Sequence, residues 1–185
     1  TRPGMRWVST TEVTNNIFSA VTNHRLNPGA MRLEHEKIDG GDGSVIGGRF
    51  NAYLNSALIA KEPWLCQRGP DKMRGYENGG DHFVKLAPLW QLQLFFAIAG
   101  HGKTDFYADI FQKVRGTDET RLSNGELQLN FMRNVCDSQK LDLSGFFTRV
   151  GMLKPIDKDM DDYSRAQLTI TERQCGEFVR YASRY

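Results

Sequence analysis

The chain has 185 residues, with 24 lysines and arginines against 22 aspartates and glutamates, four histidines and three cysteines. That length is typical of one ordinary domain, which buries enough surface to fold without a disulfide or a metal ion. The nearly balanced charge excludes a disordered chain and a polybasic nucleic-acid-binding module. The longest apolar stretch, residues 86–100, is interrupted by Pro88 and is shorter than the roughly 20 residues that cross a bilayer. No membrane span is therefore predicted. No secretion signal is found at the start of the sequence, so this test does not predict the cellular compartment of the protein.

Helical periodicity dominates the sequence. Three helices are predicted to begin at capping boxes, in which a Ser or Thr is followed three residues later by Glu. These boxes are Ser9–Glu12 before a helix at 13–23, Ser123–Glu126 before a helix at 127–137, and Thr169–Glu172 before a last helix that runs through Tyr181. Apolar periodicity predicts four more helices, at 50–61, at 89–99, at 105–115 with Thr104 as its N-cap, and at 143–150. The helix at 89–99 is apolar almost all round, so we expect it at the centre of the core.

Strand signals are few. Residues 31–38 alternate weakly, and the glycine-rich stretch 39–48 is typical of a turn, so one small hairpin there is the most we expect. Residues 67–81 are predicted to form a long loop that is functional or mobile. The widely spaced Cys66, Cys136 and Cys175 favour buried structural thiols, with one bridge from Cys66 to either of the others left open. Residues 1–185 are predicted to be a single, mainly helical unit.

No catalytic motif is complete in this sequence. His35-Glu36 begins like the H-E-x-x-H helix of zinc peptidases, but Asp39 stands where the second histidine is required. The remaining histidines are isolated, and the glycines near residues 40–48 lack the order of a phosphate-binding loop. No G-x-S-x-G sequence supports a serine nucleophile. We therefore predict no catalytic residue in the chain.

The first predicted helix has two very different faces. Its apolar face is formed by Val13, Ile17, Ala20 and Val21, and its polar face by Glu12, Asn15, Asn16, Ser19 and Asn23. Asparagine has a poor helix propensity, so two adjacent asparagines inside a helix indicate a role other than solubility. The alternative, a capping box followed by a solvated face, stays open.

Four stretches of the sequence resemble one known family. They are residues 1–7 with 9–16 (T-R-P-G-M-R-W, then S-T-T-E-V-T-N-N), residues 81–94 (D-H-F-V-K-L-A-P-L-W-Q-L-Q-L), residues 105–111 and residues 141–147. The resemblance is to the enhancin-like zinc metallopeptidases, of gluzincin type, which include bacterial mucin-degrading enzymes. It covers nearly the whole chain, and W-Q-L-Q-L is its most specific part. It implies a mainly α fold, the helical C-terminal subdomain of a zincin-type metallopeptidase, with at most a small β-hairpin.

The resemblance also implies a zinc site. In the family the third zinc ligand is a glutamate that follows the H-E-x-x-H helix, and Glu12 takes that position. Asn15, Asn16 and Ser19 would line the cleft or orient Glu12. Both histidine ligands and the catalytic glutamate would precede Thr1, so we expect a truncated form or cleavage product. One glutamate cannot hold a catalytic zinc ion, so the chain alone is expected to be inactive and to bind no metal.

The intact enzyme is expected to hydrolyse peptide bonds in glycosylated proteins such as mucins and to be exported from a bacterium. The predicted loop at 67–81 has two possible interpretations, a rim that contacts substrate or an ordinary solvated loop. Trp7 and Trp64 also have two: they stack on sugar, or they pack in the core. Without zinc, Glu12 is expected to cap the Ser9 N–H or to bind water. The alternative function is a non-catalytic helical module that binds protein or glycan, with no nucleic-acid partner and no membrane span in either case.

Overall fold

The computed structural model describes residues 5–8, 10–29, 33, 50, 53–54, 85–161 and 165–185. The helices in this part are α1 (Asn16–Leu26), α4 (Leu86–Gln93), α5 (Phe106–Arg115), α6 (Asn124–Gln139), α7 (Ser144–Arg149) and α8 (Glu172–Ala182). A π-helix, η5 (Leu94–Ile98), continues α4, and β1 (Ile156–Asp161) pairs antiparallel with β2 (Arg165–Ile170). The predicted fold class, mainly α with at most a small β-hairpin, is confirmed, but the hairpin of β1 and β2 is not the one expected within residues 31–48.

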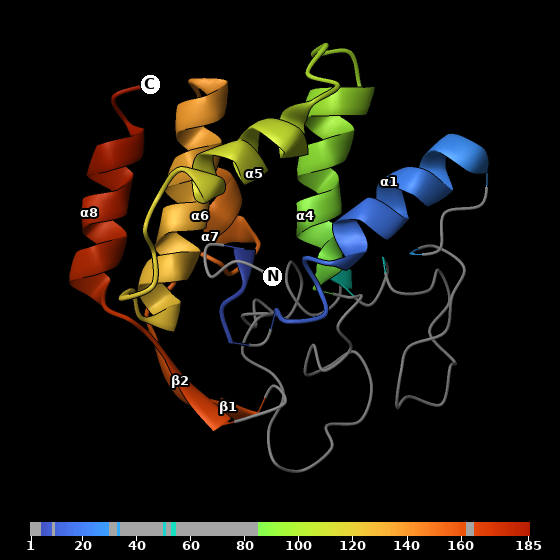
Figure 1. Cartoon of the computed structure of the whole chain (residues 1–185). Coiled ribbons are helices and arrows are strands. Elements are labelled where there is room, and N and C mark those ends of the chain that lie inside the picture. Colours follow the sequence, from blue (N-terminus) through green and yellow to red (C-terminus); the bar gives the residue numbers. More distant parts are fainter. Residues whose placement is uncertain are drawn as a thin grey trace.

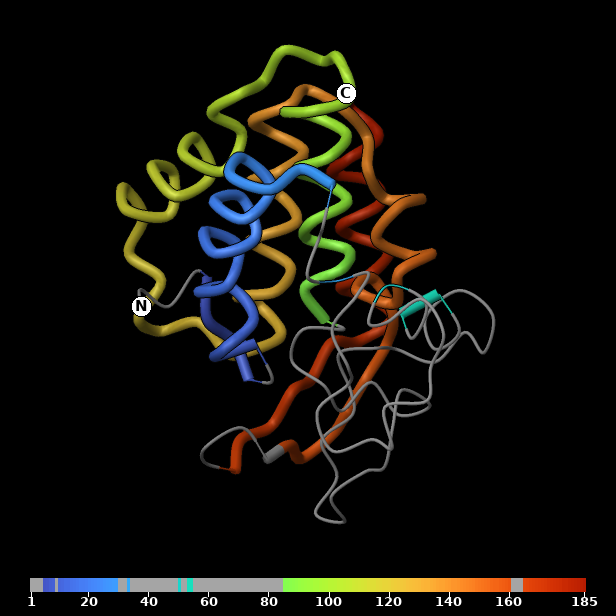
Figure 2. The backbone as a smooth tube through the Cα atoms, turned by 90° about the vertical axis from the view of Figure 1, so that its right-hand side faces the viewer, coloured from blue at the N-terminus to red at the C-terminus, as the bar shows by residue number. Residues whose placement is uncertain are grey.

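The helices pack around α4 and α6 (Figure 1). α6 contacts α5, α8 and β2, while α1 packs against α4. Seven of the eight residues of α4 are buried, which confirms it as a central core helix. The hairpin lies beyond one end of the helices in both views (Figures 1 and 2). Among the described helices, none combines the length and the apolar character needed to cross a bilayer.

The capping predictions had mixed outcomes. The box before α6 is confirmed, because the Glu126 N–H donates to Ser123 Oγ and the Ser123 N–H donates to Glu126 Oε2. The box predicted at Thr169 is wrong: β2 continues through Ile170, and the hydroxyl of Thr169 donates to Asp157 Oδ1 across the hairpin. The box that opens α8 is formed instead by Thr171 and Gln174.

Other helix starts also differ from prediction: α4 begins at Leu86 and not at residue 89, and α6 begins at Asn124 and not at residue 127. α1 begins at Asn16 and not at residue 13, because residues 11–15 form turns. The Ser9–Glu12 box that was predicted to open it includes Ser9, which lies outside the described residues. Thr104 is not the N-cap of α5; Asp105 holds that position, without a side-chain capping bond.

Several predictions fall on parts of the chain that the structure does not describe. They are the hairpin at 31–48, most of the helix at 50–61, the loop at 67–81, and the roles of His35, Trp64, Cys66 and His82. The other two cysteines are free thiols, Cys136 buried and Cys175 half-buried. Burial raises the pKa of Cys136 to about 11, and the pKa of Cys175 is raised for the same reason.

Asp137, in α6, connects the C-terminal residues to this helix by hydrogen bonds. Its Oδ1 accepts hydrogen bonds from the hydroxyls of Tyr181, at 2.5 Å, and Tyr185, at 2.7 Å. The guanidinium of Arg184 lies 3.5 Å from the same oxygen and stacks 3.7 Å from the centre of the Tyr181 ring. Burial raises the pKa of Asp137, but the two hydroxyls and the nearby cations of Lys113 and Arg184 outweigh it, so the pKa lies below its ordinary value.

Replacing Asp137 by asparagine is expected to lower the free energy of unfolding by about 1–2 kcal/mol at pH 7, because charge-assisted hydrogen bonds are weakened. A carboxyl whose pKa is lowered by folding stabilises the protein above its unfolded pKa, about 3.9, and loses that contribution as the pH falls through its native pKa. The difference between wild type and variant should therefore be full at pH 7 and should shrink progressively as the pH falls below about 4. Urea unfolding at a series of pH values from 7 downward measures it, with Asp159→Asn in an exposed ion pair as the control. A loss of stability that is the same across the whole pH series would contradict the charge-assisted role of Asp137.

Candidate functional site

Glu12 lies in the turn that leads into α1, not within the helix. Residues on either side of Glu12 are anchored in the core, since Thr10 and Val13 are both 0% exposed. The Thr10 carbonyl accepts from the Val13 N–H at 3.0 Å and from the Thr14 N–H at 3.3 Å. Glu12 itself is half-buried. A polar side chain is thus placed at the edge of the core on a backbone that is fixed close to it.

The two predicted asparagines complete the hydrogen bonds of this turn. In a regular helix the Glu12 carbonyl would accept from the backbone N–H of residue 16, but the Asn16 N–H bonds to the Val13 carbonyl instead. The Asn16 side chain replaces the backbone N–H as the donor, since Asn16 Nδ2 donates to the Glu12 carbonyl at 2.6 Å. Asn15 Nδ2 likewise donates to the Thr11 carbonyl, at 3.3 Å. Both amides therefore support the backbone around Glu12, which explains poor helix formers at these positions.

The other faces of this segment follow the predicted pattern. Ile17 and Ala20 are buried, like Val13, while Asn15 is exposed and Ser19 is half-buried in α1. The apolar face predicted for this region is therefore confirmed. Of the predicted site residues, the structure joins Asn16 to the Glu12 carbonyl, while Asn15 bonds to Thr11 and Ser19 lies further along α1.

Trp7 anchors the turn from its N-terminal side. It is 1% exposed, and its ring centre lies 5.5 Å from that of Phe131 in α6. Thr10 closes a tight turn on it, because the Thr10 N–H and hydroxyl donate to the Trp7 carbonyl at 3.1 and 2.7 Å. The backbone N–H of Trp7 donates in return to Thr10 Oγ1 at 3.2 Å. Of the two interpretations for Trp7, packing in the core is the one the structure supports.

A glutamate is a suitable zinc ligand, but catalytic zinc sites use three protein ligands. In the part of the chain that the structure describes, no three His, Cys, Asp or Glu side chains come together in a metal-binding group. His24 lies against Trp90, with ring centres 5.7 Å apart, and His101 lies 4.2 Å from the ring of Phe95. The described residues therefore do not form a complete zinc site.

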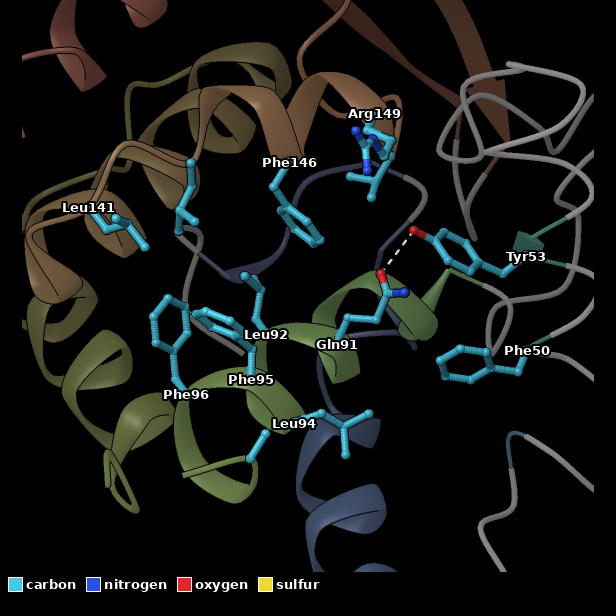
Figure 3. Close-up of a pocket in the computed structure, with 13 residues that line it drawn as sticks. Phe50, Tyr53, Gln91, Leu92, Leu94, Phe95, Phe96, Leu141, Phe146 and Arg149 are labelled. Atoms are coloured by element: carbon cyan, nitrogen blue, oxygen red, sulfur yellow. Dashed lines mark hydrogen bonds between the residues drawn. The ribbon is translucent and has the colours of Figure 1, made fainter. Parts of the chain in front are cut away.

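An apolar cavity of about 620 Å³ lies between α4, η5 and α7 (Figure 3). Its lining is mostly aromatic and aliphatic: Phe50, Tyr53, Gln91, Leu92, Leu94, Phe95, Phe96, Ala99, Leu141, Leu143, Phe146, Arg149 and Val150. The Tyr53 hydroxyl donates to Gln91 Oε1 at 3.0 Å, and Arg149 is the one charged side chain among these residues. Burial raises the pKa of Tyr53 well above its ordinary value, although Arg149 opposes the shift, so the phenol stays neutral.

Sequence reasoning assigned the apolar run of this cavity to the core and missed its π-helical end. The Ala99 N–H donates to the Leu94 carbonyl at 2.7 Å, five residues back. Such π-helical segments are frequent at functional sites. The turn at residues 10–15 contributes none of the lining, so this cavity and Glu12 are separate features of the described structure.

The fold is that of solved metallopeptidases. A metallopeptidase from Bacteroides thetaiotaomicron matches with a TM-score of 0.71 and 18% identity, over 98% of this chain and 28% of that chain. A metallopeptidase in complex with Tn antigen matches with a TM-score of 0.68 and 19% identity, over 98% of this chain and 30% of the other. The chain thus spans less than a third of either protein, and at these identities the likeness shows the fold alone. No curated protein matches the chain.

The family described as Peptidase M60, enhancin and enhancin-like, matches residues 1–151. The chain belongs to this family. The family resemblance read from the sequence is thereby confirmed, while the role of Glu12 stays a prediction.

Proposed function

We propose that the chain is the helical C-terminal portion of a zinc metallopeptidase that cleaves peptide bonds in glycosylated proteins such as mucins. The observation that carries this proposal is the family match over residues 1–151. A glycoprotein substrate is supported by the shared fold with a metallopeptidase in complex with Tn antigen, a glycan. Export from a bacterium is part of the proposal, because mucin-type substrates lie outside the cell.

In this proposal Glu12 supplies one carboxylate ligand to zinc, and an H-E-x-x-H segment of the same protein supplies two histidines and the catalytic glutamate. Zinc, when bound, acts as a Lewis acid toward water and the substrate carbonyl. Asn15, Asn16 and Ser19 line the cleft or orient Glu12. The amide of Asn16 would do so through the Glu12 backbone carbonyl, to which its Nδ2 donates at 2.6 Å. Residues 1–185 alone are proposed to be inactive, because they provide one ligand of three.

A cleavage assay tests this proposal. The protein that contains this chain together with an H-E-x-x-H segment is incubated with a mucin-type glycopeptide and with the same peptide lacking its glycan. Mass spectrometry should detect cleavage of the glycopeptide only, which a zinc chelator abolishes and added zinc restores. No cleavage of either peptide by the zinc-loaded protein would contradict a peptidase, and equal cleavage of both would contradict glycoprotein specificity.

The second candidate function is a non-catalytic module that binds a partner protein. The cavity between α4, η5 and α7 favours it, since its apolar lining suits aliphatic or aromatic side chains better than a glycan, which needs many hydrogen-bonding groups. The guanidinium of Arg149 in the lining adds a preference for an acidic group beside the apolar one.

Filling this cavity should block its ligands. Ala99 is exposed and lines the cavity, so Ala99→Trp is expected to weaken binding of the aromatic anion 1-anilinonaphthalene-8-sulfonate at least tenfold. Dye fluorescence titration measures the affinity. Val179→Trp is the matched control, because Val179 is 43% exposed on α8 and lies outside the lining. Equal affinities of the dye for wild type and Ala99→Trp would contradict a binding role for the cavity.

A further inference from the structure

We propose that Asn124, the first residue of α6, is a positioning residue for Glu12. The inference rests on the proposed function, because it concerns how the chain holds Glu12 as a zinc ligand. Asn124 is far from Glu12 in the sequence and is not a ligand. It acts through the backbone that carries Glu12.

The Asn124 side chain joins two separate parts of the fold. Its Oδ1 accepts from the Val8 N–H at 2.8 Å, and its Nδ2 donates to the Gln167 carbonyl of β2 at 3.0 Å. The orientation of the amide follows from its partners, because exchanging O and N would set a donor against the Val8 N–H and an acceptor against the Gln167 carbonyl. One amide thus bridges the segment before Glu12 and the hairpin.

Hydrogen bonds among the described neighbours of Val8 connect it to the turn that carries Glu12. Val8 is buried, and its neighbour Trp7 accepts both hydrogen bonds from Thr10. The Thr10 carbonyl in turn accepts from the N–H of Val13, so bonds lie on both sides of Glu12. Because Glu12 lies in a turn, its position is set by such external bonds and not by a regular helical ladder. Ligands held on loops depend on this kind of support for their geometry.

The first turn of α6, where Asn124 lies, is held firmly in place. The capping box of Ser123 and Glu126 fixes the first turn of α6. Gly125 lies so close to β2 that a Cβ added there would be 1.8 Å from the Thr169 carbonyl oxygen. Asn124 stands between these two constraints, and half-buried, so its amide has little freedom to move away from Val8.

Two substitutions separate the bonds of Asn124. Asn124→Asp keeps an acceptor for the Val8 N–H, whereas Asn124→Ala removes it. Both residues suit the first turn of a helix, so both variants should fold. Zinc affinity is measured by competition with a chelator, in the protein that contains this chain and an H-E-x-x-H segment. Asn124→Ala is expected to lower it about tenfold or more, and Asn124→Asp by less than about threefold.

A second readout does not depend on zinc. Amide hydrogen exchange of the metal-free protein should be faster at Val8 in Asn124→Ala, and close to wild type in Asn124→Asp. Asp137→Asn serves as the stability control, because it weakens the attachment of α8 to α6 and should leave zinc affinity within about twofold of wild type.

The outcomes separate this inference from the proposed function. If Glu12→Gln leaves zinc affinity unchanged, Glu12 is not a ligand and the proposed function fails together with the inference. If Glu12→Gln lowers zinc affinity and Asn124→Ala does not, Glu12 is a ligand but Asn124 does not position it. Equal losses in Asn124→Asp and Asn124→Ala would also overturn the inference, because the Val8 bond would then not matter.

Discussion

Replacing Gly125 by alanine is expected to lower the free energy of unfolding of this chain by about 3 kcal/mol or more. The added Cβ would lie 1.8 Å from the carbonyl oxygen of Thr169 and 2.8 Å from its carbonyl carbon. Both are backbone atoms, so no side-chain rotation relieves the overlap. The start of α6 and β2 would have to separate, which would also disturb the bond from Asn124 to Gln167.

Gly145→Ala is the matched control for this prediction. Gly145 lies in α7 with no atom within 4 Å of an added Cβ, so alanine should leave stability unchanged or raise it by up to about 1 kcal/mol. Urea unfolding followed by circular dichroism measures both variants. A loss of less than about 1 kcal/mol in Gly125→Ala would show that α6 and β2 are not in the close contact described here.

Glu12→Gln is expected to reduce kcat/KM of the zinc-loaded peptidase about 100-fold or more. Glutamine has nearly the same shape as glutamate but is neutral, so it would bind zinc poorly while occupying the same turn. Kinetics with a mucin-type glycopeptide and zinc content by mass spectrometry provide the measurements. Glu172→Gln, at the exposed start of α8, is the control and should behave as wild type. A fully active Glu12→Gln protein would contradict the ligand role.

The helices that the sequence predicted well are those with signals that are local in the chain. The box at Ser123 and Glu126 satisfies N–H groups within one turn, and the apolar stripe of α5 buries Phe106, Ile110 and Val114 as its spacing requires. Local spacing was sufficient in both cases, because the partners are three or four residues apart.

The hairpin was missed because its signal is not local. β1 reads I-D-K-D-M-D, and charged residues in such numbers are depleted in strands in general. The strand is stabilised by pairing with β2 and by burial of Met160, which is 1% exposed. Because β2 occupies the residues up to Ile170, the box predicted at Thr169 could not form, and the helix starts after Thr171 instead.

In the candidate site, too, only the interactions between residues close in the sequence could be predicted. The low helix propensity of Asn15 and Asn16 marked them as unusual, and their bonds to nearby carbonyls lie within reach of sequence reasoning. The hydrogen bond from the Val8 N–H to Asn124 could not be predicted from the sequence, because it joins residues that only the folded chain brings together. Glu12 was selected by family resemblance and not by spacing, since its proposed co-ligands are not part of this sequence.

Anomalous X-ray scattering at the zinc absorption edge would show whether Glu12 binds zinc. The crystals would contain the protein in which this chain is joined to its H-E-x-x-H segment. A zinc peak is expected about 2.0–2.2 Å from a carboxylate oxygen of Glu12, with two histidines completing the protein ligands. A fully occupied zinc ion bound by other side chains, with Glu12 more than about 4 Å away, would contradict it.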